Sequence, residues 1–380
     1  MIQERLKALR AEMEKRGITV YVVPTADFHE SEYVGDHFKA RKFITGFTGS
    51  AGTAVITLDE AGLWTDGRYF VQAENQLKDS TVTLYRMGEE GVPTVDEFVK
   101  DRLKEGGCLG FDGRVVNGTW GGKLEKIAAE KNVSMHVTED LIDLIWEDRP
   151  ALSKQPLFIL EEKYSGKSTA DKIADLRKAM KENGADVHIL TSLYDIAWLL
   201  NIRGNDIDYV PVVLSYLVLN ETECIWFLQE EVVDDKIRAY LEENHITTKP
   251  YDAIYDYVPE IPADAVVLMN RGTVNYRIVN SLDKAIKVVD KPNPTELMKA
   301  VKNKTEVDNT RAAHVKDGVA FTKFMYWLKT NIGKIPMTEI SASDYLEARR
   351  REQDNFMELS FNTICAYGAN AANVFHSVFC

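Results

Sequence analysis

A run of glycines followed by one arginine is the stretch of this sequence with the clearest chemical meaning. Residues 45–70 read TGFTGSAGTAVITLDEAGLWTDGRYF, with glycines at 46, 49 and 52. Glycine adopts backbone angles that other residues resist, so the chain can turn sharply here with little side-chain bulk. Two strands of a hairpin follow, and a final Asp-Gly turn exposes Arg68. A bent loop and a fixed guanidinium predict one wall of a pocket.

The residues alone leave two interpretations of Arg68 open. The first is a local pairing with Asp66 or another exposed carboxylate, which is the commoner state of a surface arginine. The second is a ligand contact, for which a planar and permanently charged donor fork is well suited. The glycine spacing differs from that of a dinucleotide-binding loop, and no acidic residue follows where a ribose would need one, so a nucleotide site is not indicated.

A possible metal site on a predicted helix has too few ligands. Arg311, His314 and Asp317 fall at i, i+3 and i+6, a spacing that could bring a histidine and a carboxylate together. No third or fourth ligand has comparable spacing. The pattern therefore favours a hydrogen-bonded helix surface, and no metal ligand is predicted in this chain.

Composition and charge limit the class of protein. The chain has 380 residues, of which 45% are hydrophobic and 28% charged, enough for two or three cores. The net charge of -13 argues against nucleic-acid binding, and the longest apolar run, residues 209–219, is too short to cross a bilayer. The four cysteines (Cys108, Cys224, Cys365 and Cys380) are scattered, and the N-terminus reads as an amphipathic helix and not as a secretory signal. We therefore expect a cytoplasmic protein without a nucleic-acid or membrane partner.

Two proline-marked seams divide the chain. They are RPALSKQP at 149–156 and DKPNP at 290–294, and they predict domains over residues 1–152, 153–293 and 294–380. LRAEMEKRGITVYVV at 9–23 matches LRKAMKENGADVHIL at 176–190, offset by 167 residues, and strand-turn-strand segments ending at Trp64 and Trp226 also correspond. The match predicts two similar α/β domains with mixed sheets and the same strand order.

The last segment differs from the first two. Thr305-x-x-Asp308 and Ser341-x-x-Asp344 predict capping boxes that open two helices, the second ending near Arg351. SFNTICAYGAN at 360–370 predicts a strand and a turn. Two helices and one strand cannot enclose a core, so the segment reads as the first layer of a larger domain.

Long motifs in all three segments resemble the Xaa-Pro aminopeptidases (aminopeptidase P), in the long three-domain form within the creatinase and prolidase superfamily. The matching residues are HESEY at 29–33, Arg41, TGFTGSAG, LWTDGRYF, SLYDIAWLLNIRGNDIDYVPV at 192–212, VKNKTEVDNTRAAHVKDGVA at 301–320 and ELSFNTICAYGANAA at 358–372. The resemblance implies two tandem creatinase/prolidase N-terminal-like α/β domains, followed by the start of an α+β pita-bread domain of metallopeptidase family M24.

The resemblance also implies an activity and its residues. In that family two divalent ions, usually Mn²⁺, activate a water that attacks the carbonyl before proline and releases the N-terminal residue of a peptide. Arg68 corresponds to an arginine that reaches the cleft and contacts the peptide. His376 corresponds to a catalytic histidine that hydrogen-bonds the substrate, but it lies one residue later than usual and lacks the tyrosine that normally follows. The full-length family enzyme is expected to be a homodimer.

One departure from the family decides what we expect of these 380 residues. The five metal ligands of the family, two Asp, one His and two Glu, all lie downstream of the motif at which this chain stops. We therefore expect a C-terminally truncated chain that binds no Mn²⁺ and is inactive alone. Two alternatives stay open: a prolidase or creatinase relative, which usually carries only one N-terminal domain, and a non-catalytic α/β module that binds or dimerises without hydrolysis.

Overall fold

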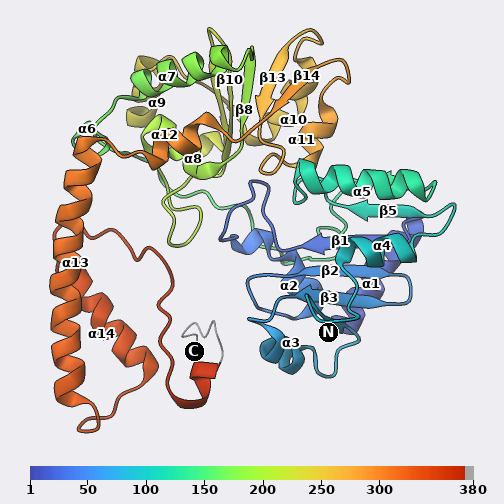
Figure 1. Ribbon diagram of the computed structural model, residues 1–380, viewed down its shortest axis with the longest axis horizontal. Coiled ribbons are helices and arrows are strands. Elements are labelled where there is room, and N and C mark those ends of the chain that lie inside the picture. The colour runs from blue at the N-terminus through green and yellow to red at the C-terminus, as the bar shows by residue number, and fades with distance from the viewer. Residues whose placement is uncertain (373–380) are drawn as a thin grey trace.

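The first α/β unit of the computed structural model, which describes residues 1–372, is built on a six-stranded mixed sheet (Figure 1). The strand order is β4-β3-β2-β1-β5-β6. The strands are β1 (Val20–Pro24), β2 (Thr53–Thr57), β3 (Ala61–Thr65), β4 (Thr83–Arg86), β5 (Cys108–Phe111) and β6 (Ser134–His136). Helices α1 (Ile2–Lys15), α2 (Ala40–Thr45) and α3 (Phe70–Leu77) share one core, and α4 (Val95–Arg102) and α5 (Gly118–Glu130) share the core on the other face. A 3-10 turn, η1 (Asp36–Phe38), precedes α2.

The second unit repeats this plan with the order β12-β11-β10-β8-β13-β14. Its strands are β8 (Val187–Leu190), β10 (Ser215–Leu219), β11 (Cys224–Leu228), β12 (Thr247–Pro250), β13 (Val266–Met269) and β14 (Lys287–Asp290). Its helices are α7 (Thr169–Glu182), α8 (Leu193–Leu200), α9 (Asp235–Glu243), α10 (Ile254–Tyr257) and α11 (Tyr276–Ser281), with 3-10 turns η2 (Glu230–Val232), η3 (Tyr251–Ala253) and η4 (Val258–Glu260). A small ribbon of β7 (Phe158–Ile159) and β9 (Ile202–Arg203) and the short α6 (Glu162–Ser165) complete it.

The two units have the same strand order and the same parallel and antiparallel pairings, as the sequence repeat predicts. The leading helices bury equivalent stripes: Leu6, Leu9 and Met13 in α1, and Ile173, Leu176 and Met180 in α7. After each helix a glycine, Gly17 or Gly184, takes a positive φ of 67° or 63° and ends it. The predicted mixed α/β fold with two tandem domains is confirmed.

One detail of the predicted repeat is wrong. Trp64 and Trp226 occupy corresponding positions in the sequence repeat, but they pack on different faces of their sheets. Trp64 packs with α4 and α5, whereas Trp226 packs with α7 and α9, which lie on the opposite face of the equivalent sheet. Side chains alternate across a strand, so a shift of one residue moves a side chain to the other face. The two hairpins therefore correspond as hairpins, but their tryptophans do not.

Equivalent surfaces of the two units pack against each other, with α11 beside α5 (Figure 1). Four backbone hydrogen bonds cross this interface in two reciprocal pairs: Gly118 N to Val274 O (2.8 Å) with Tyr276 N to Val116 O (2.7 Å), and Thr119 N to Arg271 O (3.0 Å) with Arg277 N to Gly113 O (2.9 Å). Positions 116, 118 and 119 of the first unit correspond to 274, 276 and 277 of the second. Reciprocal contacts of this kind are typical of a two-fold interface between identical subunits, so the units are arranged like the halves of a homodimer.

Side chains at this interface break the symmetry. The ring of Tyr276 covers Gly121, and the side chain of Val279 covers Gly118. The first unit thus supplies glycines at the positions where the second unit supplies bulk. This complementarity favours pairing of unlike units within one chain, because two copies of the bulky surface would collide and two copies of the glycine surface would leave gaps.

The C-terminal part is helical, with α12 (Pro294–Ala300), the long α13 (Lys304–Asn331), α14 (Glu339–Arg351) and the 3-10 turn η5 (Gly368–Ala372). Lys299 Nζ pairs with the buried Asp195 at 2.6 Å, and Asn303 Nδ2 donates to Ser165 O at 2.8 Å, which anchors α12 and the start of α13 to the second unit. Helices α13 and α14 pack against each other through the stacked rings of Trp327 and Tyr345, whose centroids lie 4.0 Å apart.

Two expectations for this part need correction. The capping boxes are Asn303 with Glu306 and Thr338 with Ser341, because these N-cap residues have the extended backbone that a cap requires. Residues 360–372 contain only a single bridge position at Ile364 and no strand, since the described residues offer no further sheet to pair with. Val315, Phe321 and Tyr326 are exposed on α13, whereas Phe324, Met325, Trp327 and Leu328 are partly covered.

Among the described residues, no helix is long and apolar enough to cross a membrane.

Candidate functional site

A pocket of about 590 Å³ lies where the two α/β units meet the C-terminal part. Glu30, Glu32 and Tyr33 line it from the first unit, Tyr194 and Tyr209 from the second, and Phe361 from the segment after α14. We call it the junction pocket. Its residues come from three parts of the chain, so it exists only when the units are docked.

The loop that carries the two glutamates is held by Asp27. The Oδ1 atom of Asp27 accepts hydrogen bonds from the backbone N–H groups of His29 and Ser31, each at 2.9 Å. Glu30, between them, has a φ of 57°, a left-handed conformation that is uncommon for a residue other than glycine. The turn presents Glu30 and Glu32 toward the pocket.

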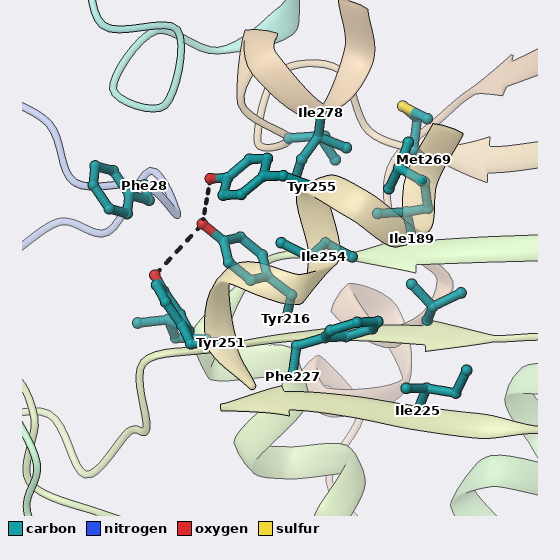
Figure 2. Packing of buried hydrophobic residues seen from close by; sticks show 14 of the residues in the cluster. Phe28, Ile189, Tyr216, Ile225, Phe227, Tyr251, Ile254, Tyr255, Met269 and Ile278 are labelled. Carbon is teal, nitrogen blue, oxygen red and sulfur yellow. Dashed lines mark hydrogen bonds between the residues drawn. The ribbon is translucent and has the colours of Figure 1, made fainter. Parts of the chain in front are cut away.

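His29 fastens this loop to the second unit. Its Nδ1 donates to the carbonyl oxygen of Thr191 at 3.0 Å, and its Nε2 lies 2.6 Å from the hydroxyl of Tyr251. Figure 2 shows that the hydroxyl of Tyr216 joins those of Tyr251 and Tyr255, at 3.4 and 2.9 Å. Burial lowers the pKa of His29 to about 4, so the ring is neutral at neutral pH and acts as a positioning residue.

Two carboxyl groups, those of Glu30 and Glu32, line the pocket. Loss of solvent around the Glu30 carboxyl raises its pKa to about 7, and the nearby charge of Asp27 contributes to the rise. Asp27 is only 1% exposed, and its second oxygen, Oδ2, has no hydrogen-bond partner among the described residues. Within the described part of the chain, no lysine or arginine is found within 4 Å of the carboxylates of Asp27, Glu30 or Glu32.

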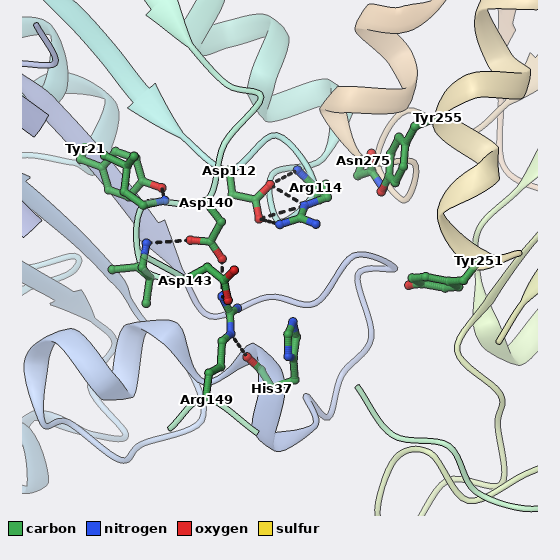
Figure 3. Close-up of polar contacts among 12 residues, drawn as sticks. Tyr21, His37, Asp112, Arg114, Asp140, Asp143, Arg149, Tyr251, Tyr255 and Asn275 are labelled. Atoms are coloured by element: carbon green, nitrogen blue, oxygen red, sulfur yellow. Dashed lines mark hydrogen bonds and ion pairs between the residues drawn. The ribbon is translucent and has the colours of Figure 1, made fainter. Parts of the chain in front are cut away.

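A second polar cluster beside the interface is fully paired and therefore structural (Figure 3). Arg114 binds both oxygens of the buried Asp112, with Nε–Oδ1 and Nη2–Oδ2 distances of 3.0 Å, and its guanidinium stacks 4.4 Å from the centre of the Phe28 ring. Arg149 pairs with Asp140 at 2.6 Å and donates to the His37 carbonyl at 2.9 Å. These contacts hold the loops around the unit boundary in place. Nothing in the sequence pattern singled them out.

The site residues predicted from the sequence lie away from the junction pocket or outside the described residues. Arg68 makes a bidentate pair with Asp66, with Nε–Oδ1 and Nη2–Oδ2 distances of 2.8 Å, and it does not line the junction pocket. His376 lies outside the described residues. Arg41 is buried and donates to Thr25 Oγ1 at 2.9 Å and to the carbonyl oxygens of Phe47 and Gly49, so it supports the glycine-rich loop. The HESEY segment, by contrast, supplies much of the pocket wall.

The described residues do not fit a dinuclear metal centre. None of their histidine, cysteine, aspartate and glutamate side chains form a group of three or more that could hold a metal ion. Two hard cations need several convergent oxygen and nitrogen ligands. No catalytic step through a metal can therefore be assigned to the described part of the chain.

Family models match almost the whole chain. Residues 5–145 and 148–306 each match a Creatinase/Prolidase N-terminal domain, and residues 308–378 match Metallopeptidase family M24.

Individual relatives agree with these matches. The probable Xaa-Pro aminopeptidase P of Sordaria macrospora is 39% identical over 97% of this chain and 62% of its own length, and that of Neurospora crassa is 38% identical over 97% and 56%. The crystal structure of X-prolyl aminopeptidase from Caenorhabditis elegans, described as a cytosolic enzyme with a di-nuclear active site, has a TM-score of 0.94 at 31% identity, over 100% of this chain and 64% of that one. The chain thus spans about three fifths of the length of these relatives.

Proposed function

We propose that this chain, a homologue of the Xaa-Pro aminopeptidases P of metallopeptidase family M24, belongs to a protein that removes the N-terminal residue from peptides with proline in second position. Two creatinase/prolidase N-terminal domains precede its M24 segment. The observation that carries the proposal is the match of the whole described chain to a solved X-prolyl aminopeptidase at a TM-score of 0.94. We place the domains at residues 1–152, 153–293 and from 294 onward.

The two N-terminal domains supply cleft walls in this proposal, and the metal centre belongs to the M24 domain. Two Mn²⁺ ions are the proposed cofactors, a homodimer is the proposed assembly, and the cytoplasm is the proposed compartment. Residues 1–380 alone are proposed to be inactive, because the described residues offer no ligand set for two ions.

Peptidase assays with two proteins test this function. A chain extended to the length of its relatives should release the first residue of an Xaa-Pro peptide in the presence of Mn²⁺, whereas residues 1–380 should release none and retain no Mn²⁺ after dialysis. A matched peptide with alanine in place of proline is the control for specificity. Failure of the extended chain to cleave any Xaa-Pro peptide would reject the proposed function. Turnover by residues 1–380 would reject the proposal that these residues are inactive alone.

Two other functions predict different results in these assays. A prolidase would cleave Xaa-Pro dipeptides and spare longer peptides. A non-catalytic module would bind peptides with no cleavage even in the extended chain.

A further inference from the structure

We propose that Tyr209 is a positioning residue for the proposed peptidase reaction, because its turn fixes the M24 segment against the two α/β units. The inference deepens the proposed function and rests on it for the reaction that the M24 domain performs. Three observations carry it: the strained backbone of Tyr209, the rigid support of its turn, and the length of α13, through which the M24 segment is attached.

The two least expected backbone conformations of the described chain both occur at the junction pocket. Seven of the described residues other than glycine have a positive φ, and five of them are asparagine, aspartate or histidine, the types that tolerate this conformation best. The other two are Glu30, with a φ of 57°, and Tyr209, with a φ of 67°. Both line the pocket, one from each α/β unit. Strain of this kind persists only where the surroundings impose it, and it is commonest at functional sites.

The turn that carries Tyr209 has a rigid support. Val210 N donates to Ile207 O at 3.2 Å, so Tyr209 takes the third position of a β-turn, where a positive φ normally selects glycine or asparagine. The side chains of Ile207 and Val210 are buried in the core of the second unit. Just before the turn, the buried carboxylate of Asp206 accepts hydrogen bonds from two backbone N–H groups, at 3.1 and 2.9 Å. The ring of Tyr209 therefore projects from a fixed base.

Tyr209 lies where the three parts of the chain meet. Its ring packs beside that of Tyr33 in the first unit, with centroids 6.2 Å apart and a tilt of 60°. Phe361, from the M24 segment, lines the same pocket. Burial raises the pKa of the Tyr209 hydroxyl, and the nearby charges of Asp208 and of Glu347 in α14 raise it further. One side chain of the second unit thus borders both the first unit and the M24 segment.

Charge does not draw the turn and the M24 segment together. Burial raises the pKa of Glu358 in the M24 segment, and the charge of Asp208 in the turn adds to this rise. Like charges repel, so these two carboxylates oppose the contact. The contact therefore depends on the shape of the turn and on the aromatic ring, which Tyr209→Phe keeps and Tyr209→Ala removes.

The length of α13 makes the position of the M24 segment sensitive to such a contact. The helix is attached to the second unit at its start, where Asn303 Nδ2 donates to Ser165 O at 2.8 Å, and from there it extends away while α14 returns alongside it (Figure 1). Its 28 residues make it about 42 Å long, so a rotation of about 5° at the attached end would displace the far end by about 4 Å. A displacement of about 1 Å can cost an enzyme about a hundredfold in rate. A second contact, at the Tyr209 turn, restricts this rotation.

Spin labels on the 380-residue chain test the position of the M24 segment without catalysis. Thr330→Cys and Glu90→Cys place the labels at exposed positions, one at the far end of α13 and one in the first unit, while Cys365→Ser and Cys380→Ser remove the C-terminal thiols and the two remaining cysteines are buried. Double electron–electron resonance should give one narrow distribution of distances. Tyr209→Ala should broaden it by about 4 Å, the displacement that a rotation of about 5° gives at that end of α13.

Two more variants separate the ring from the strained backbone. Tyr209→Phe keeps the ring and the turn, and it should leave the distribution of distances unchanged. Tyr209→Gly removes the ring but accepts the positive φ without strain, so it should fold even where Tyr209→Ala does not, and it should give the same broadening.

Kinetics of a chain extended to the length of its relatives test the role of Tyr209 in the reaction. Tyr209→Ala should lower kcat for an Xaa-Pro peptide about tenfold or more and change KM less than about twofold, because a misplaced M24 domain loses rate more than it loses binding. Tyr209→Phe should restore kcat. Tyr257→Ala is the matched control, because it removes a half-buried tyrosine of the second unit that does not line the pocket, and it should leave kcat unchanged.

Several outcomes would overturn this role of Tyr209. They are an unchanged distribution of distances when the ring is removed, full kcat in Tyr209→Ala, an equal fall of kcat in Tyr209→Phe, or an equal fall in Tyr257→Ala. If the extended chain cleaves no Xaa-Pro peptide, the proposed function fails, but the distances measured in the 380-residue chain still decide whether Tyr209 fixes the M24 segment. The two failures are therefore separate results.

Discussion

Adding one methyl group at Gly121 should loosen the interface between the two α/β units. A Cβ atom at this position would lie 2.1 Å from Cδ2, 2.4 Å from Cγ and 2.8 Å from Cβ of Tyr276. Rotation about χ1 of Tyr276 can move the ring but not its Cβ. The backbone of α5 or α11 must therefore shift, and the reciprocal hydrogen bonds at the start of both helices shift with it.

Gly122, the next residue of α5, is a matched control, because a Cβ there meets nothing within 4 Å. Replacing a helical glycine with alanine stabilises a helix by about 0.8–1.0 kcal/mol, and this gain is common to both positions. Overpacking of a filled site costs about 1–3 kcal/mol. Gly122→Ala should therefore raise the free energy of unfolding by about 1 kcal/mol, and Gly121→Ala should lower it by up to about 2 kcal/mol.

Urea unfolding of the two variants under identical conditions measures this difference directly. In a Tyr276→Gly background all three clashing side-chain atoms are absent, so Gly121→Ala should then behave as Gly122→Ala does. Equal stabilities of the two alanine variants in the unsubstituted background would refute the steric argument. A persistent penalty in the Tyr276→Gly background would show that Gly121 is needed for a reason other than the tyrosine side chain.

Two further predictions concern His29 and Arg68. The imidazole of His29 takes up a proton below pH about 6.5 in the unfolded chain, whereas the buried ring stays neutral down to pH about 4. The free energy of unfolding should therefore fall as the pH drops through this window, by about 3 kcal/mol more in the unsubstituted chain than in His29→Gln. Equal pH dependences of the two proteins in urea unfolding would contradict this. In a chain extended to the length of its relatives, Arg68→Ala should lower kcat/KM for an Xaa-Pro peptide roughly ten- to a hundredfold, the loss of a contact of about 1.5–3 kcal/mol, with metal content unchanged. An unaffected kcat/KM would leave Arg68 as the surface partner of Asp66 that the structure shows.

Local patterns in the sequence were enough for the repeated architecture. The stripe of Leu9 and Met13 in α1 recurs as Leu176 and Met180 in α7, and a glycine with positive φ ends each helix. Helical periodicity, glycine caps and strand alternation depend on neighbours within a few residues, so they can be read without the fold. The same patterns predicted the mixed sheets and their common strand order.

Only the tertiary structure decided which residues of distant segments meet. Glu30 and Tyr209 line one pocket, and Gly121 lies beneath Tyr276, because reciprocal backbone contacts dock the two units face to face. Trp64 and Trp226 occupy opposite faces of equivalent sheets although their letters align. Contacts of this kind depend on docking geometry and on strand register to a single residue, and neither leaves a periodic trace in the sequence.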